Sequence, residues 1–195
     1  TSGTLTTASS YTASSLTSGN TYYLRIQTVD DDGNFSTVNW QPFIYKFDNE
    51  APSNPTTVTA DPPGYTASNN FAVSWSGATD SASLVNQYCY KLSSSGSETC
   101  TTEASASGAL AYQTGTNSFY VRSKDTAGNY ASDYANVAFY YSSIAPGAPQ
   151  NMRVTYPVGT SSNTVNEFAF AWDAPGTYYG QQTGLRYYYS FNALP

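Results

Sequence analysis

The chain has 195 residues and a formal net charge of −6, and charged residues make up 10% of it while aromatic residues make up 16%. The acidic balance argues against a nucleic-acid partner, and no apolar run approaches the roughly 18 residues of a membrane span. Histidine is absent, which excludes Ser-His-Asp and Cys-His catalytic devices. We therefore expect no catalytic residues, no enzymatic activity and no membrane span in this segment.

The predicted secondary structure is all-β. Turn residues punctuate short runs rich in Val, Tyr, Phe and Thr, and helical periodicity is missing. After a Ser/Thr-rich approach, Tyr22, Leu24 and Ile26 share one face of a predicted strand and belong to a core. A turn at residues 30–34 leads to a second alternating strand at residues 43–47.

Two Pro-containing stretches, at residues 49–55 and 143–149, read as linkers. Between them the alternation of apolar residues predicts strands that place four further side chains in a core: Trp75, Tyr88, Phe119 and Val121. After the second linker, residues 168–172 repeat the strand around the first tryptophan, with Trp172 in the core, and residues 187–191 repeat the next strand.

The chain contains an internal repeat. The sequence YYLRIQTVDDDGNF at 22–35 returns as NSFYVRSKDTAGNY at 117–130, and 95 residues separate Gly33 from Gly128 in the two turns. Trp75 and Trp172 are 97 residues apart. This period is the size of one small β-sandwich domain.

The repeat resembles a fibronectin type III domain. The pattern L-x-x-G-x-T-Y-x-L-R-I at 16–26 is similar to the turn and sixth strand of that family, with Tyr22 at the place of its tyrosine corner. FAVSW at 71–75 resembles the second strand, and the pattern R-x-K-D-x-A-G-N at 122–129 resembles Ig-like modules of bacterial surface proteins. The resemblance implies tandem β-sandwich modules. Asn117 departs from it by standing where the corner tyrosine would be.

The expected domains follow from these repeats. Residues 1–50 correspond to the late strands of one module, residues 51–143 to a complete module, and residues 144–195 to the early strands of another. We hypothesise that the two partial modules complete each other, between copies or within a longer array, and such a head-to-tail contact would build a filament. A chain boundary that happens to cut the modules is the alternative.

Cys89 and Cys100 are the only cysteines. Cys89 lies on the outward face of its predicted strand when Tyr88 and Tyr90 face inward. An even count in a chain of secreted character favours a disulfide that closes a small hairpin, worth roughly 2 to 4 kcal/mol. Two buried free thiols are the alternative.

Acidic residues gather at two places, with Asp30 and Asp32 in the first turn and Asp48 and Glu50 just before the first linker. Calcium takes several oxygen ligands and is common at joints between extracellular modules, so these four residues are its candidate ligands. The spacing does not match an EF-hand loop. The alternative is a solvated turn whose Asp side chains cap backbone amides. No other metal or cofactor is expected.

Consecutive tyrosines must place some rings on the outside of a sheet. Outward aromatic rings on a surface of low charge suit stacking on sugars or contact with a protein partner. The candidates are Trp40, Tyr140, Tyr178 and Tyr188. The alternative is ordinary cross-strand pairing of aromatic residues.

Three classes of function remain. The first is a structural segment of a stalk, fibre or filament on a microbial surface, whose partners are other copies or neighbouring modules. The second is an adhesive module for carbohydrate or a surface protein, and the third is an accessory domain of a secreted hydrolase. The missing catalytic residues, the linkers and the repeat favour the first, at an extracellular or cell-surface location.

Overall fold

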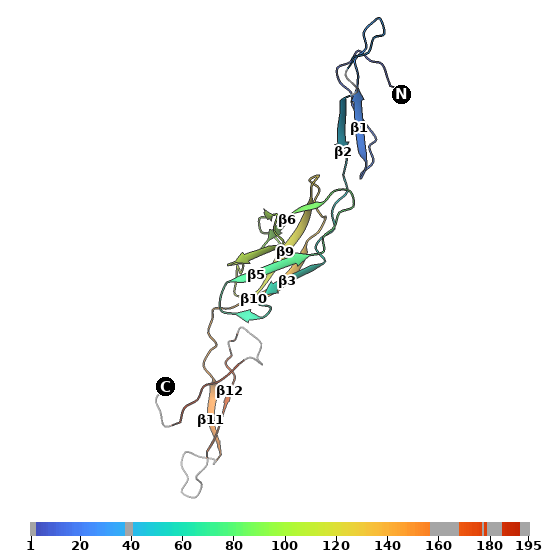
Figure 1. The fold of residues 1–195 in the computed structure, drawn as a ribbon. Helices are drawn as coiled ribbons and strands as arrows, with labels where there is room; N and C mark the ends of the chain where they lie inside the picture. The colour runs from blue at the N-terminus through green and yellow to red at the C-terminus, as the bar shows by residue number, and fades with distance from the viewer. Residues whose placement is uncertain (1–2, 38–40, 157–167, 177, 179–184, 192–195) are drawn as a thin grey trace.

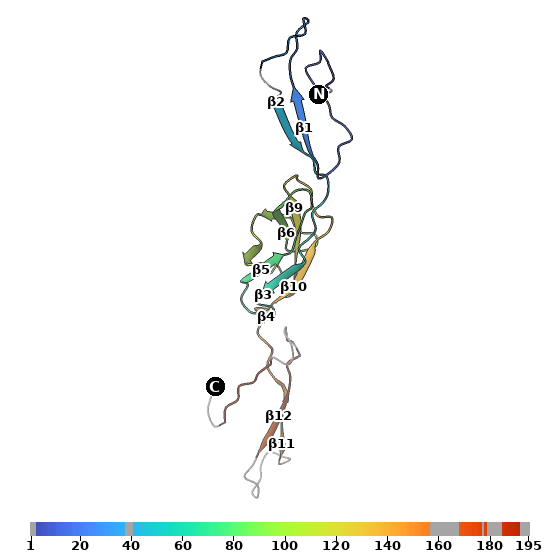
Figure 2. The same cartoon turned by 45° about the vertical axis from the view of Figure 1, so that its right-hand side comes forward.

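The computed structural model describes residues 3–37, 41–156, 168–176, 178 and 185–191. These residues form twelve β-strands and no helix, which confirms the expected all-β class. The strands group into three regions that follow one another along the length of the molecule (Figures 1 and 2). A two-stranded ribbon lies at each end, and the other eight strands lie between them.

The middle region, which we call the central sandwich, contains two sheets. One has five strands in the order β4-β10-β9-β6-β7, and the other has three in the order β3-β5-β8. All neighbours are antiparallel except β4 and β10. The strands are β3 (Thr57–Asp61), β4 (Tyr65–Thr66), β5 (Phe71–Ser76), β6 (Val85–Lys91), β7 (Thr99–Thr101), β8 (Ser105–Gly108), β9 (Gly115–Asp125) and β10 (Ala135–Tyr141).

The core of the central sandwich follows from the alternation of its strands. Every second residue of β5 and β9 is buried, so their apolar side chains meet between the two sheets. The Trp75 ring stacks on Phe119 at 5.7 Å between centroids, and Phe71 meets Phe139 edge to face at 4.6 Å. Each such buried side chain stabilises the fold by about 1.5–3 kcal/mol.

Among the described residues, no second sheet lies over either ribbon. The N-terminal ribbon pairs β1 (Thr21–Ile26) with β2 (Gln41–Lys46), with Leu24 opposite Phe43. The C-terminal ribbon pairs β11 (Gln150–Tyr156) with β12 (Ala169–Asp173), with Val154 opposite Phe170 and two irregularities in register. Each ribbon is antiparallel and two strands wide.

The repeated turn has the same hydrogen bonds in both copies. The carboxylate of Asp30 accepts from the backbone N–H of Asn34 at 2.7 Å and from its side-chain amide at 2.9 Å. The carboxylate of Asp125 accepts from the backbone and side chain of Asn129, both at 2.8 Å. The glycine of each turn has a positive φ, 86° in the first and 103° in the second. The sequence repeat is therefore also a repeat of backbone geometry.

The predicted strand at residues 187–191 is not formed. Residues 185–191 are described without regular strand structure. The corresponding strand of the central sandwich, β6, pairs with β9, whereas none of the described strands pairs with residues 187–191. One tertiary contact is nevertheless kept, because Trp172 meets Tyr187 edge to face at 5.4 Å as Trp75 meets Tyr88 at 5.6 Å.

The two linkers differ. In the first, Pro52 and Pro55 are buried, the backbone N–H of Ser53 donates to the carbonyl of Thr79, and Asn54 donates to the carbonyl of Asp133. The second linker, residues 143–149, is exposed throughout. The first linker is thus part of the central sandwich, which the sequence pattern did not predict.

Candidate functional site

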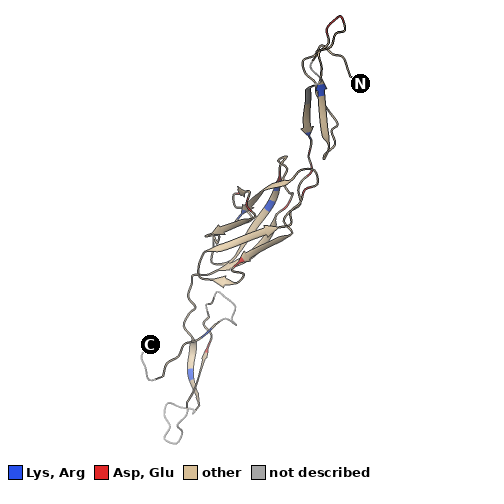
Figure 3. Cartoon of the chain, in the orientation of Figure 1, with Lys and Arg blue, Asp and Glu red and all other residues tan. Residues whose placement is uncertain are grey.

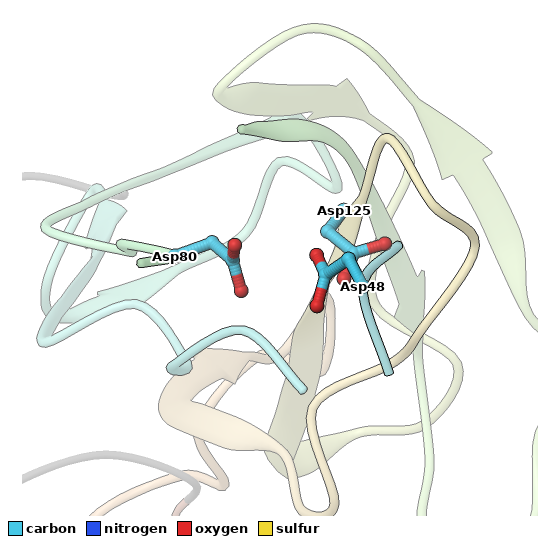
Figure 4. A group of neighbouring side chains, drawn as sticks. All are labelled: Asp48, Asp80 and Asp125. Atoms are coloured by element: carbon cyan, nitrogen blue, oxygen red, sulfur yellow. The ribbon is translucent and has the colours of Figure 1, made fainter. Parts of the chain in front are cut away.

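Three acidic side chains converge where the N-terminal ribbon joins the central sandwich (Figure 4). Asp48 follows β2, Asp80 lies in the loop between β5 and β6, and Asp125 ends β9. One carboxylate oxygen from each lies within 4.8 Å of the others. Asp125 is only 1% exposed. Of these three residues, only Asp48 was predicted from the sequence as a calcium ligand. Asp80 lies in a loop that is distant from Asp48 in the sequence.

The hydrogen bonds of this acidic junction are incomplete. Asp48 Oδ1 accepts from the Ser18 hydroxyl at 3.1 Å and from the Glu50 backbone N–H at 2.9 Å. Asp48 Oδ2 is buried and accepts no hydrogen bond. The nearby Ser83 hydroxyl lowers the pKa of Asp48 most, followed by the Glu50 N–H, although the Ser83 geometry falls short of a hydrogen bond. A buried, unpaired carboxylate oxygen beside two further carboxylates is a donor set that suits a hard divalent cation.

The other acidic candidates lie elsewhere. Asp30 belongs to the repeated turn, where hydrogen bonds from Asn34 lower the pKa of its carboxyl group. Asp32 is exposed in the same turn, and Glu50 accepts a hydrogen bond from the Ser81 hydroxyl at 3.2 Å. The structure therefore does not bring these three together with Asp48 into one set of ligands.

Cys89 and Cys100 form a disulfide, which confirms the predicted pairing. They lie directly opposite each other on β6 and β7. Cys89 occupies the face of the sheet away from Trp75, as expected, yet it is fully buried. On β9, Arg122 lies opposite Cys89.

Cations and tyrosines alternate over this outer face of β6 and β9. Lys91 Nζ lies 4.2 Å from the ring centroid of Tyr134, and Arg122 Cζ lies 4.4 Å from that of Tyr130. Glu98 forms an ion pair with Arg122 at 2.7 Å and accepts a hydrogen bond from the Tyr134 hydroxyl. The hydrogen bond from Arg122 is the main cause that lowers the pKa of Glu98. These side chains interact with one another on the face of the sheet that carries the disulfide.

The position of the tyrosine corner holds different side chains in the two repeats, Tyr22 and Asn117. Both side chains accept hydrogen bonds from backbone N–H groups of the preceding segment. The Thr17 backbone N–H donates to the Tyr22 hydroxyl at 2.7 Å. Asn117, 95 residues later, is fully buried and accepts from the backbone N–H groups of Tyr112 at 3.0 Å and Gln113 at 3.2 Å. The amide of Asn117 thus ties down the preceding loop of the central sandwich in place of a tyrosine.

The aromatic binding candidates have different environments. Tyr140 is half-buried and packs against Tyr65 with ring centroids 5.0 Å apart. Tyr178 is half-buried and engaged with its surroundings. Tyr188 is fully exposed. Trp40 lies outside the described residues.

Both ribbons expose the apolar side chains that were expected to face a core. Tyr22, Leu24 and Trp172 are half-buried. Ile26 is 60% exposed, so its expected core position does not hold, because no second layer from the described residues covers the ribbon. Few charged residues interrupt either ribbon (Figure 3).

The exposed face of the C-terminal ribbon is hollowed into a groove of about 800 Å³. Its lining is mostly aromatic and apolar and comes from β11, β12 and residues 187–191: Met152, Phe168, Phe170, Trp172, Tyr187 and Tyr189 among others. An apolar groove of this kind favours an apolar occupant over water.

Comparison of the chain with protein-family models and with curated proteins gives no match. Among the described residues, no helix is long and apolar enough to cross a membrane.

Proposed function

We propose that this chain is a non-enzymatic structural segment of an extracellular stalk, fibre or filament, built from tandem sandwich modules of fibronectin type III-like type. One observation carries the proposal. The apolar positions exposed on the two ribbons are the positions that, one repeat away, form the buried core of the central sandwich. Such ribbons are poorly stable alone and acquire a core when a neighbouring module region covers them.

Other features support an extracellular setting and a mechanical role. Disulfides persist in oxidising compartments, and the Cys89–Cys100 bond closes a short loop with a sequence separation of 11. The first linker is hydrogen-bonded into the central sandwich, which restricts bending at that joint. A stiff joint at the first linker suits a segment that bears load along a stalk.

The cofactor that fits this role is Ca²⁺. Asp48, Asp80 and Asp125 would hold it, because the buried Asp48 Oδ2 lacks a donor and each of the other two residues offers a carboxylate oxygen. A cation there would join the residue that follows β2 to two loops of the central sandwich. The test is a thermal melt with Ca²⁺ against EDTA. A rise in Tm that is absent in Asp80→Asn supports the site, and equal melts in the parent chain reject it.

The proposed function is tested by joining two copies end to end in one polypeptide, so that Pro195 is followed by Thr1. The C-terminal ribbon of the first copy and the N-terminal ribbon of the second should then form a module within the chain. We expect a protease-resistant junction and a second cooperative unfolding transition. A junction that is cleaved as fast as the free ends would overturn the proposal.

Adhesion is the second candidate function, because Tyr188 is fully exposed and Tyr189 is 86% exposed beside a ribbon of low charge. Exposed tyrosines can stack on sugar rings. Binding to a glycan array that is lost in Tyr188→Ala would favour adhesion over a purely structural role. The proposed partners are accordingly other copies or neighbouring modules first, and a carbohydrate or surface protein second.

A further inference from the structure

We infer that the N-terminal ribbon of one copy docks onto the apolar groove of the C-terminal ribbon of a second copy, so that the two close into one sandwich. This inference rests on the proposed function and names its partner and the register of the contact. The central sandwich is the internal template for the layer that would cover each ribbon.

The N-terminal ribbon is a copy of the pair β9–β10. In the central sandwich, Asn117 lies opposite Phe139 and Phe119 lies opposite Val137. In the ribbon, the residues 95 positions before Asn117 and Phe119 are Tyr22 and Leu24, and they lie opposite Tyr45 and Phe43. Register and facing are therefore the same in the two pairs, and the same face of each should meet an opposing sheet.

The C-terminal ribbon is a copy of the opposing layer. β12 repeats β5, with Phe168 and Trp172 each 97 residues after Phe71 and Trp75. The edge-to-face contact of Trp172 with Tyr187 repeats that of Trp75 with Tyr88. The groove thus has the arrangement that receives β9 and β10 in the central sandwich.

The template assigns the contacts between copies. Phe119 stacks on Trp75 in the central sandwich, so Leu24 of one copy should pack on Trp172 of the next. Phe139 meets Phe71 edge to face, so Tyr45 should meet Phe168 in the same way. Both members of each assigned pair are apolar or aromatic, and none leaves a charge buried without a partner.

The contact also supplies a missing strand partner. In the central sandwich, Cys89 of β6 lies opposite Arg122 of β9. The corresponding residues are Tyr188, which is fully exposed, and Gln27. Residues 187–191 of the copy that supplies the groove should therefore pair antiparallel with β1 of the docked copy and with the residue that follows β1, so that Tyr188 lies opposite Gln27. Strand addition of this kind forms backbone hydrogen bonds between the two edges.

A second copy is the favoured occupant because both complementary faces lie on this same chain. The donor face and the acceptor face are different surfaces, so the contact is heterologous and repeats from copy to copy. A neighbouring module of a longer chain could reach the same groove, and the tests below separate these sources.

The first test is the mass of the full chain across a concentration series, with electron microscopy of the heaviest fraction. We expect linear oligomers. Phe43→Asp should raise the concentration of half-assembly at least about tenfold, because it places a charge on the docking face. The matched control is Ile44→Asp, since Ile44 is exposed to a similar degree, 56% against 65%, on the opposite face of the same strand. Equal effects of the two variants would overturn the inference.

The second test fixes the register by cross-linking. Gln27→Cys with Tyr188→Cys should give an oxidised ladder of covalent oligomers, whereas Arg25→Cys with Tyr188→Cys, two residues out of register, should give much less. Equal ladders would reject the register. A chain that stays monomeric and uncross-linked at every concentration would reject docking between copies. In that case a protease-resistant junction in the end-to-end polypeptide would still support the proposed function, with the groove filled from within a longer chain.

Discussion

The same residue pattern is buried in one region of this molecule and exposed in another. Phe71 and Val121 of the central sandwich are 1% and 0% exposed, whereas their counterparts in the repeat, Phe168 and Ile26, are 50% and 60% exposed. The strands form in both places because alternation and cross-strand pairing are local properties. Burial requires a second layer, and within the described part of the chain such a layer is present in the central sandwich and not over the ribbons.

Replacing the equivalent tryptophans of the two regions with alanine should give the largest difference in the free energy of unfolding. Trp75→Ala removes a ring that is 3% exposed and contacts three other aromatic rings, so it should lower the free energy of unfolding by about 3–5 kcal/mol. Trp172→Ala, measured in urea at a concentration where the chain is monomeric, should leave the main unfolding transition in place. Similar losses from both variants would mean that the C-terminal ribbon folds as one unit with the central sandwich.

The sequence predicts those parts of the fold that depend on interactions between residues close together in the chain. Period-2 alternation located β1, β5 and β9, and the repeated turn was recognisable from its Asp and Gly-Asn residues. The pairing of Cys89 with Cys100 followed from an even count and a short spacing. The failed strand at 187–191 shows the limit, because a strand also needs a neighbour and the sequence of one segment does not state whether that neighbour is present.

The acidic junction could be predicted only in part for the same reason. Asp48 stood beside a linker, which is a local cue. Asp80 joins it from the loop between β5 and β6, and Asp125 joins it from the end of β9. The sequence pattern places Asp125 at the start of the repeated turn, but its position beside Asp48 depends on how the N-terminal ribbon meets the central sandwich.

Equivalent substitutions in the two copies of the repeated turn, Asp125→Ala and Asp30→Ala, should have an intermediate effect on stability. Asp125→Ala removes a buried carboxylate that accepts from Gly128 N–H at 2.7 Å and twice from Asn129. We expect a loss of about 1–3 kcal/mol, since those donors are left unsatisfied away from water. Asp30→Ala should cost less, because water replaces the lost acceptor in an exposed turn. Urea unfolding measures both. A gain in stability from Asp125→Ala would instead mean that repulsion among the three carboxylates dominates.

The smallest expected effect is on the pH dependence of stability. It comes from one ion pair in the central sandwich and one in the C-terminal ribbon. Arg122 lowers the pKa of Glu98 from its ordinary value of 4.5, and Asn151, followed by Arg153, lowers the pKa of Asp173 from 3.8. A lowered pKa in the folded state means that each group adds stability above its unfolded pKa and loses it as the pH falls through the folded value. The Arg122–Glu98 side chains are 24% and 27% exposed, against 51% and 48% for Arg153–Asp173. Screening by solvent limits the first contribution to less than about 1 kcal/mol.

Glu98→Gln should therefore reduce the stability of the central sandwich near pH 7 and have no effect below the folded pKa of Glu98. Asp173→Asn should leave the main transition unchanged throughout this pH range, because Asp173 lies in the two-stranded sheet of β11 and β12, which we expect to unfold separately from the central sandwich. Urea unfolding at pH 7 and at a series of successively lower pH values measures both variants. A loss from Glu98→Gln that persists at low pH would show that the side chain acts through packing over the disulfide rather than through its charge.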